Sequence, residues 1–170
     1  MKTRKHSVCL GLGSNIESEK NLVLAVEYIR TYLELKSASA AWETPAVGTD
    51  GPDFLNAAVL IDTHLSAVDL KTRVIQKIEQ KLGRVRTQNK YAPRTIDIDI
   101  LIFDNQILEP LIWKHAYLAV PVAELLPDIQ SEELGINLKA MARQLLKSTH
   151  ITPRYDVRLY SSLNINEPKP

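Results

Sequence analysis

The chain has 170 residues, of which 45% are hydrophobic and 24% are charged, a composition typical of a soluble globular domain. This balance excludes a collagen-like or disordered chain, and no apolar run approaches the ~18 residues of a membrane-spanning helix. The 21 basic and 20 acidic residues leave a net charge of +1, so bulk charge predicts neither nucleic-acid nor membrane binding. The single Cys9 can form no internal disulfide. We expect one cytoplasmic, monomeric domain over residues 1–170.

The first part of the chain predicts two strands around a helix. Residues 8–12 form an apolar run typical of a short buried strand, closed by the Gly-Ser-Asn sequence at 13–15. A helix is expected from about Ser18, a good N-cap residue, because apolar residues then recur at helical spacing. Residues 35–42 predict a second strand. Residues 43–52 contain two prolines and two glycines and therefore predict a loop.

The central part repeats this order. Residues 54–63 predict a strand with two different faces, the odd positions on one and the even positions on the other. A helix is expected over 66–82, capped by Ser66 with an acidic residue three positions on, and ended by Gly83. Residues 96–103 predict a further strand, with one face formed by isoleucines. Those isoleucines are Ile96, Ile98, Ile100 and Ile102, and they alternate with Asp97, Asp99, Leu101 and Phe103.

The order strand, helix, strand, strand, helix, strand is that of the ferredoxin-like βαββαβ plait, an α/β (α+β) fold. We expect a mainly antiparallel sheet of four or more strands, with both helices on one face and the opposite face free for a ligand. Residues 120–127 predict a short helix or turn, and 129–147 a C-terminal region whose helix covers about 137–147. The tail over 148–170 is expected to be peripheral.

Two carboxylates and a cluster of cations lie close together in the sequence. Asp97 and Asp99 are two residues apart on a predicted strand, so both project from one face and can share hard cations such as Mg²⁺. Residues 84–94 contain four cations and no acid. Arginine offers a planar fork that matches phosphate oxygens, so Arg84 and Arg94 suit a polyphosphate clamp. A solvated surface loop is the alternative interpretation of the cations.

A second group of residues suits an uncharged planar ligand. Phe54 and Asn56 share a strand face, where a ring can stack on a heterocycle and a carboxamide can satisfy its donor and acceptor edge. As alternatives, Phe54 could be a core residue and Asn56 a strand-end cap. The loop after Thr44 could line the same pocket with backbone groups. His115 lies beside Lys114 and Tyr117 and is a further candidate.

Together these segments resemble the 6-hydroxymethyl-7,8-dihydropterin pyrophosphokinases of folate biosynthesis. The resemblance covers about residues 7–128 and keeps the family's order. The matching segments are Gly11-Leu12-Gly13-Ser14-Asn15, Thr44-Pro45 with Gly48, Pro52-Asp53-Phe54-Leu55-Asn56-Ala57-Ala58-Val59, Glu79 with Leu82-Gly83-Arg84-Val85-Arg86, Pro93-Arg94-Thr95-Ile96-Asp97-Ile98-Asp99-Ile100-Leu101, and Pro121 through Pro127-Asp128.

The resemblance implies an enzyme that moves the diphosphate of ATP onto the pterin hydroxymethyl oxygen and releases AMP. By position, Asp97 and Asp99 would bind two Mg²⁺ ions. The residues implied at the nucleotide are Glu79, Arg84, Arg86 and Arg94, with Lys114 or His115. Those implied at the pterin are Thr44, Val47, Phe54, Asn56 and Tyr117. The implied partners are small molecules, with no nucleic acid and no membrane.

The stretch between Phe103 and Pro121 departs from the family. It is shorter than usual, and Lys114 and His115 stand near the place of a loop arginine that would bind phosphate. A divergent pterin-binding paralogue with weak or altered kinase activity is therefore an alternative function. A ferredoxin-like RNA-binding module is another, but the sequence lacks the exposed aromatic motifs that such a module uses. A non-enzymatic interaction protein would require the aspartate pair to be structural.

Overall fold

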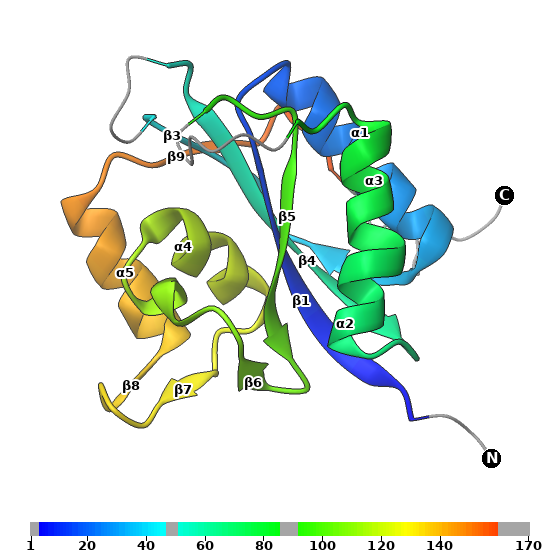
Figure 1. Ribbon diagram of the computed structural model, residues 1–170. Coiled ribbons are helices and arrows are strands. Elements are labelled where there is room, and N and C mark those ends of the chain that lie inside the picture. The colour runs from blue at the N-terminus through cyan, green and yellow to red at the C-terminus, as the bar shows by residue number, and fades with distance from the viewer. Residues whose placement is uncertain (1–3, 47–50, 86–91, 160–170) are drawn as a thin grey trace, which may run out of the picture.

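A computed structural model describes residues 4–46, 51–85 and 92–159 of the chain (Figure 1). The candidate residues Val47 and Arg86 lie outside the described residues. The main sheet is antiparallel, with strand order β6-β5-β1-β4-β3-β9, and β2 also pairs with β4. Its strands are β1 (His6–Ser14), β2 (Glu34–Ala38), β3 (Ala41–Thr44), β4 (Phe54–Thr63), β5 (Asp97–Phe103), β6 (Gln106–Ile107) and β9 (Thr152–Arg154).

One face of the sheet carries the two helices that the sequence predicts. They are α1 (Ser18–Tyr32) and a helical stretch made of α2 (Ala67–Asp69), the π turn η1 (Leu70–Ile75) and α3 (Gln76–Lys81). Glu17 occupies the N-cap of α1, one residue before the expected Ser18. The predicted cap of the second stretch is confirmed, because the Asp69 N–H donates to Ser66 Oγ at 3.1 Å. Its end is confirmed too, since Gly83 follows with a positive φ of 73°.

The sequence predicts that the opposite face of the sheet is free, but helices cover part of it. The short helix η2 (Pro110–Trp113), α4 (Ala116–Leu125) and α5 (Leu138–Ser148) pack on it, with β7 (Gln130–Ser131) and β8 (Ile136–Asn137) forming a small separate sheet (Figure 1). The predicted helices near 120–127 and 137–147 are thus confirmed. They form a second layer because most of α4 is apolar, which requires burial on more than one side.

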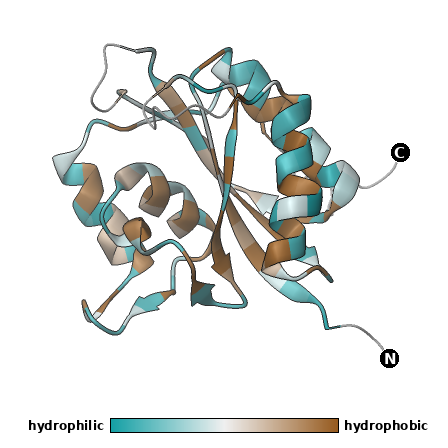
Figure 2. Cartoon of the chain, in the orientation of Figure 1, coloured by the Kyte–Doolittle hydropathy of each residue, from teal (hydrophilic) through white to brown (hydrophobic). Residues whose placement is uncertain are grey.

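Each face of the sheet therefore has its own hydrophobic core (Figure 2). Strand β4 supplies both cores and confirms the predicted alternation. Its odd positions, including Leu55 and Val59, pack with α1 and the second helical stretch, whereas Ala58 packs with α4. Among the described residues, no helix is long and apolar enough to cross a membrane.

The segment predicted as one strand over 35–42 is two strands. Between β2 and β3, the Ser39 N–H donates to the Ala58 carbonyl at 2.9 Å, and the Ala58 N–H donates to Ser39 Oγ at 2.9 Å. Because the serine hydroxyl replaces a backbone acceptor, the pairing with β4 is interrupted there. Both pieces still pair with β4, so the sheet order is unaffected.

Strand β5 also departs from its predicted alternation. Its register with β1 shifts at a β-bulge, so that Leu10 pairs with Ile100 but Cys9 pairs with Ile102. The extra residue turns Leu101 and Ile102 both into the core below α4. Ile102 is therefore not on the face of Ile96, Ile98 and Ile100, as the sequence pattern predicts. Asp97 and Asp99 precede the bulge and keep their common face.

The prediction that the tail over 148–170 is peripheral is wrong for the first part of this segment. Residues 152–154 form β9, which pairs with β3 at the sheet edge, and Arg154 bonds to Glu43 at 2.7 Å. Leu159 is 7% exposed and lies in the main core. Sequence patterning misses this strand because it is only three residues long and contains a proline, which is tolerated at an edge. Residues 160–170 lie outside the described residues.

Candidate active site

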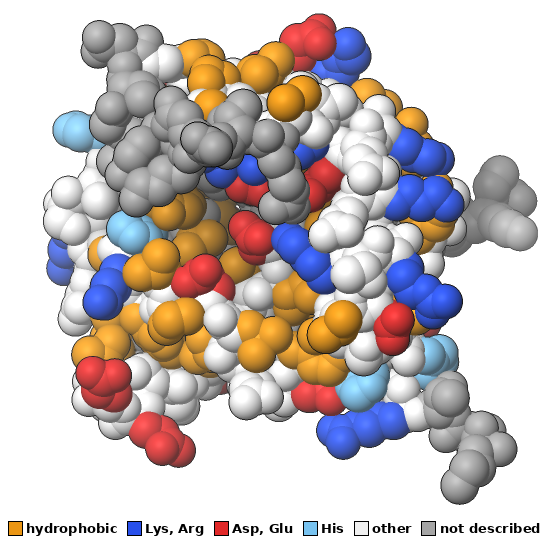
Figure 3. Space-filling model, in the orientation of Figure 1, with side chains coloured by type: hydrophobic (Ala, Val, Ile, Leu, Met, Phe, Trp, Pro, Cys, Tyr) orange, Lys and Arg blue, Asp and Glu red, His pale blue; other side chains and the backbone are white. Residues whose placement is uncertain are grey.

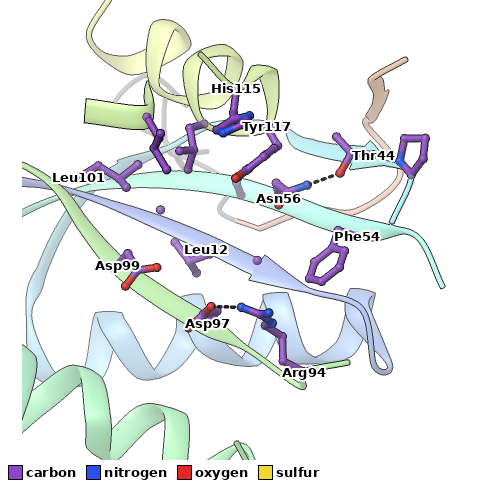
Figure 4. A pocket seen from close by; sticks show the side chains of 16 residues that line it. Leu12, Thr44, Phe54, Asn56, Arg94, Asp97, Asp99, Leu101, His115 and Tyr117 are labelled. Atoms are coloured by element: carbon purple, nitrogen blue, oxygen red, sulfur yellow. Dashed lines mark hydrogen bonds and ion pairs between the residues drawn. The ribbon is translucent and has the colours of Figure 1, made fainter. Parts of the chain in front are cut away.

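A cavity of about 520 Å³ lies on the sheet face that α4 covers only in part (Figure 4). Residues of β1, β3, β4 and β5 form its floor, and η2 and α4 form one wall. In the view of Figure 3, hydrophobic side chains gather around the centre of the molecule, with acidic and basic side chains among them. Of the sequence-predicted residues, the cavity brings together Thr44, Phe54, Asn56, Arg94, Asp97, Asp99, His115 and Tyr117.

Asp97 is held by both arginines of the predicted phosphate clamp. Arg94 Nη1 lies 2.5 Å from Asp97 Oδ2, and Arg84 Nη2 lies 3.2 Å from Asp97 Oδ1. The two guanidinium groups converge because Arg84 follows the end of α3 while Arg94 leads into β5. Their side chains are only 13% and 19% exposed, so the charges face one another rather than solvent. The two guanidinium groups therefore compensate the charge of the Asp97 carboxylate.

Asp99 has a different partner, which the sequence does not suggest. Lys71 Nζ lies 3.1 Å from Asp99 Oδ1 and donates to the Ile98 carbonyl at 2.7 Å. The Asp99 side chain is 59% exposed, compared with 24% for Asp97, so it is the more accessible carboxylate. Sequence reasoning misses Lys71 because it is separated from Asp99 by 28 positions and belongs to no motif.

The Gly-Ser-Asn sequence at the end of β1 positions Arg94. The Arg94 N–H donates to Asn15 Oδ1 at 2.7 Å, and the Asn15 N–H donates to the Arg94 carbonyl at 3.1 Å. Ser14 Oγ donates to the Thr95 carbonyl at 2.5 Å. These bonds fix the chain just before β5 and hence the direction of the Arg94 side chain. The motif marks the position in the sequence, but only the structure assigns it this role.

The glycines of the same segment keep the cavity floor open. In the sheet, Gly13 lies between Asp97 of β5 and Asn56 of β4, and Gly11 pairs with Asp99. A Cβ on Gly13 would lie 3.4 Å from Asn56 Oδ1, and one on Gly11 would lie 2.7 Å from Leu101 Cδ1. A larger residue at position 13 would therefore project towards the Asn56 amide, and one at position 11 would collide with the Leu101 side chain.

The aromatic and amide side chains form the other side of the cavity (Figure 4). Asn56 is 6% exposed, and its Nδ2 donates to Thr44 Oγ1 at 2.9 Å. This bond fixes the orientation of the carboxamide and leaves Oδ1 on the side of Gly13. The Arg94 guanidinium carbon lies 5.8 Å from the centre of the Phe54 ring. Arg94 therefore links the carboxylates to the aromatic wall.

His115 and Tyr117 close the cavity from α4. Their rings stack with centroids 5.1 Å apart and planes 19° apart, and both residues line the cavity. Burial is the main cause that raises the pKa of the Tyr117 hydroxyl above its usual value, followed by the charge of Glu109. Lys114 is exposed and is not among the cavity-lining residues. The structure therefore brings His115, and not Lys114, to this site.

Glu79 lies behind the site rather than in it. Its side chain is 2% exposed, and Oε1 accepts a hydrogen bond from the Ile98 N–H at 3.0 Å. The bond joins α3 to β5 directly beside the two aspartates. The expected contact of Glu79 with a nucleotide stays a prediction. Sequence reasoning also missed Leu111 and Leu118, which line the apolar part of the cavity.

The family model and two curated relatives that match this chain name the same enzyme family. Residues 9–127 match the family model of 7,8-dihydro-6-hydroxymethylpterin-pyrophosphokinase (HPPK). A 2-amino-4-hydroxy-6-hydroxymethyldihydropteridine pyrophosphokinase from Methylorubrum extorquens is 39% identical over 132 residues, which is 71% of this chain and 82% of that protein. The protein of the same name from Bacillus subtilis is 33% identical over 135 residues, covering 72% of this chain and 80% of the other.

The fold agrees with this assignment. The structure of Plasmodium falciparum HPPK-DHPS with pteroate superposes with a TM-score of 0.67 at 12% identity, over 86% of this chain and 43% of that one. This chain thus spans less than half of that protein. At such low identity the likeness concerns the fold, whereas the family model and the closer relatives concern the sequence that builds the cavity. The chain belongs to the 7,8-dihydro-6-hydroxymethylpterin-pyrophosphokinase family.

Proposed function

We propose that this chain transfers the diphosphate of ATP to 6-hydroxymethyl-7,8-dihydropterin in folate biosynthesis, releasing AMP. Family membership supports the activity. We assign the activity to this cavity because the Asp97–Asp99 pair and the wall of Phe54 and Asn56 line it together. A diphosphate transfer between two small molecules needs these two halves side by side.

The pterin would bind at the aromatic and amide side. Phe54 would stack on the ring system, and Tyr117 would form the second wall. Asn56 would read the amide edge of the heterocycle, and its fixed orientation supports this role because Thr44 already holds one of its donor hydrogens. We assign backbone contacts to the segment from Thr44 to Val47.

The triphosphate would bind at the cationic side. Arg84 and Arg94 suit phosphate oxygens, and Arg84 Nε is a buried donor without a hydrogen-bond partner within the described structure. We also assign Glu79 and Arg86 to the nucleotide. His115 is a better candidate than Lys114 for the additional phosphate contact, because it lines the cavity.

Asp97 and Asp99 fit a pair of Mg²⁺ ions. They offer hard carboxylate oxygens on one strand face, and Mg²⁺ commonly binds through one or two carboxylates together with substrate phosphates. The described residues include no group of three or more potential metal-ligating side chains, so the remaining ligands would come from ATP and water. When bound, Mg²⁺ neutralises phosphate charge and makes the phosphorus a better electrophile.

The residues of the chain then act mainly by positioning. The pterin hydroxymethyl oxygen attacks the β-phosphorus and releases its proton to solvent water. The bond from that phosphorus to the α,β-bridging oxygen breaks, and AMP leaves with that oxygen. Phe54 and Asn56 orient the attacking oxygen, while Arg84 and Arg94 stabilise the charge on the phosphates. No covalent intermediate on the protein is required. We infer that the chain works as a cytoplasmic monomer on small molecules, without nucleic-acid or membrane partners.

A coupled assay of AMP release tests this function. The purified 170-residue chain should release AMP only when 6-hydroxymethyl-7,8-dihydropterin, ATP and Mg²⁺ are all present. Asp97→Asn should lower kcat/KM by about a hundredfold or more, since electrostatic groups at phosphoryl-transfer sites contribute effects of this order. Asp62→Asn is the matched control, because Asp62 lies at the end of β4 away from the cavity residues Phe54 and Asn56 and pairs with Lys5. Full activity of Asp97→Asn would contradict the site assignment.

A further inference from the structure

The ammonium group of Lys71 occupies a position that suits a small cation. It lies 3.1 Å from Asp99 Oδ1 and 2.7 Å from the carbonyl oxygen of Ile98, so it bridges a side-chain oxygen and a backbone oxygen of neighbouring residues. The Lys71 side chain is 29% exposed, which shows that it lies along the protein surface rather than extending into solvent. The ion pair is thus a defined feature of the site.

The helix backbone is widened at this residue. Lys71 belongs to the π turn Leu70–Ile75, in which the Gln76 N–H donates to the Lys71 carbonyl five residues back. The neighbouring Leu70 and Val74 are buried in the main core, so the turn is anchored on both sides of the lysine. A π turn holds one residue more than an α turn and is often found at functional sites. The local geometry therefore holds the lysine stem beside β5.

Charge balance suggests what the lysine does. Asp97 has two guanidinium partners, Arg84 and Arg94, and Asp99 has the Lys71 ammonium. Each metal ligand of the proposed function is thus neutralised by the chain itself. An ammonium and a divalent metal repel each other and cannot both occupy the space next to Asp99 Oδ1. Binding of a metal at Asp99 requires Lys71 to move away.

We propose that Lys71 is a positioning residue that competes with the metal for Asp99. This inference rests on the proposed function, in which Asp99 is a metal ligand. Lys71 keeps free divalent ions from occupying Asp99 before the nucleotide arrives. Metal that enters with ATP brings phosphate charge, which compensates the repulsion from the lysine and lets it leave the carboxylate.

The test measures metal binding to the full chain without nucleotide. Mn²⁺ serves as the probe, and the electron paramagnetic resonance signal of the free ion reports the unbound fraction. Lys71→Met removes the charge but keeps an unbranched apolar side chain. We expect its Kd for Mn²⁺ to be about three- to tenfold lower than that of the wild type, the effect of one partly exposed unit charge about 4 Å away.

Three further variants make the result specific. Lys77→Met is the matched control, since Lys77 lies further along the same helical stretch, over the ring of Tyr32, and the variant has the same loss of charge. It should bind Mn²⁺ as the wild type does. Lys71→Arg should restore weak binding. In Lys71→Met with Asp99→Asn, the gain in affinity should be absent.

The proposal is overturned if Lys71→Met binds Mn²⁺ no more tightly than the wild type, including the case in which neither binds measurably. It is also overturned if the control Lys77→Met shows the same gain, or if the gain persists after Asp99→Asn. Thermal melting of each variant shows whether it is folded, and Lys71→Gln, which also removes the charge and should show the same gain, provides the reading if the methionine variant is not. The AMP assay of the wild type separately reports on the proposed function, so the two can fail independently.

Discussion

Replacement of Asn15 by alanine should weaken both stability and catalysis. Asn15 is 5% exposed and joins three segments. Its Oδ1 accepts from the Arg94 N–H at 2.7 Å, and its Nδ2 donates to the Pro52 carbonyl at 3.3 Å. Asn15→Ala removes both bonds and leaves the backbone groups of Arg94 and Pro52 without these partners. The segment that aims the Arg94 guanidinium at Asp97 would then be held less firmly.

These two bonds set the expected loss of stability. At about 1 kcal/mol for each hydrogen bond, the variant should lose about 2 kcal/mol of unfolding free energy. For a chain of this size, that loss corresponds to a melting temperature about 4–8 °C lower. Small displacements of a positioning group can lower rates strongly, so kcat/KM for AMP release should fall by about tenfold or more.

Asn21→Ala is the matched control. Asn21 is also buried, at 6% exposure, and donates to the Ile16 carbonyl at 2.7 Å without touching Arg94. It should lower the melting temperature but leave kcat/KM unchanged when both variants are assayed well below their melting temperatures. A positioning role for Asn15 is contradicted if Asn15→Ala has the melting temperature of the wild type, or if its kcat/KM equals that of Asn21→Ala.

Three further outcomes are expected. His115→Ala should raise the KM for ATP several-fold while Lys114→Ala has little effect, because of these two residues only His115 lines the cavity. Equal effects of the two variants in steady-state assays would contradict this. Cys9 should react with a thiol reagent at pH 8 only after the chain is unfolded by guanidinium. Burial raises the pKa of the Cys9 thiol to about 12, so little thiolate forms in the folded chain. Rapid labelling of the folded chain would argue against the described core. Arg154→Ala should lower the melting temperature by a few degrees without changing KM for pterin, because Arg154 ties β9 to β3 and α1 away from the cavity; calorimetry and steady-state kinetics check both parts.

Sequence patterning predicts best where local chemistry and burial agree. The bounds of β4, residues 54–63, are those predicted, because its odd and even positions both face a core and turn residues flank it. The common face of Asp97 and Asp99 was also predictable, since it depends only on the two-residue repeat of a strand. The long amphipathic helices follow from the 3.6-residue repeat in the same way.

The features that sequence patterning misses depend on packing between distant segments. The bulge in β5 places Leu101 and Ile102 below α4, and nothing in the alternation of the strand indicates it. Strand β9 is too short for a pattern and exists because β3 offers it an edge. Lys71 reaches Asp99 only because a helix packs beside β5. Each is a tertiary effect that local propensity does not contain.

An exchange of partners explains why so many charges can converge in one small site before any substrate binds. On the proposed function, Arg84 and Arg94 bind phosphate and Asp97 binds metal, yet in the structure the arginines and the aspartate bind one another. Substrate binding would then exchange partners: each guanidinium would trade a carboxylate for a phosphate, and the carboxylate would trade guanidinium groups for a metal. Because every charge has a partner before and after the exchange, neither state leaves a partly buried charge uncompensated, which would be costly. Gly13 allows the exchange to take place directly beside the pterin wall, since it separates Asp97 from Asn56 without a side chain.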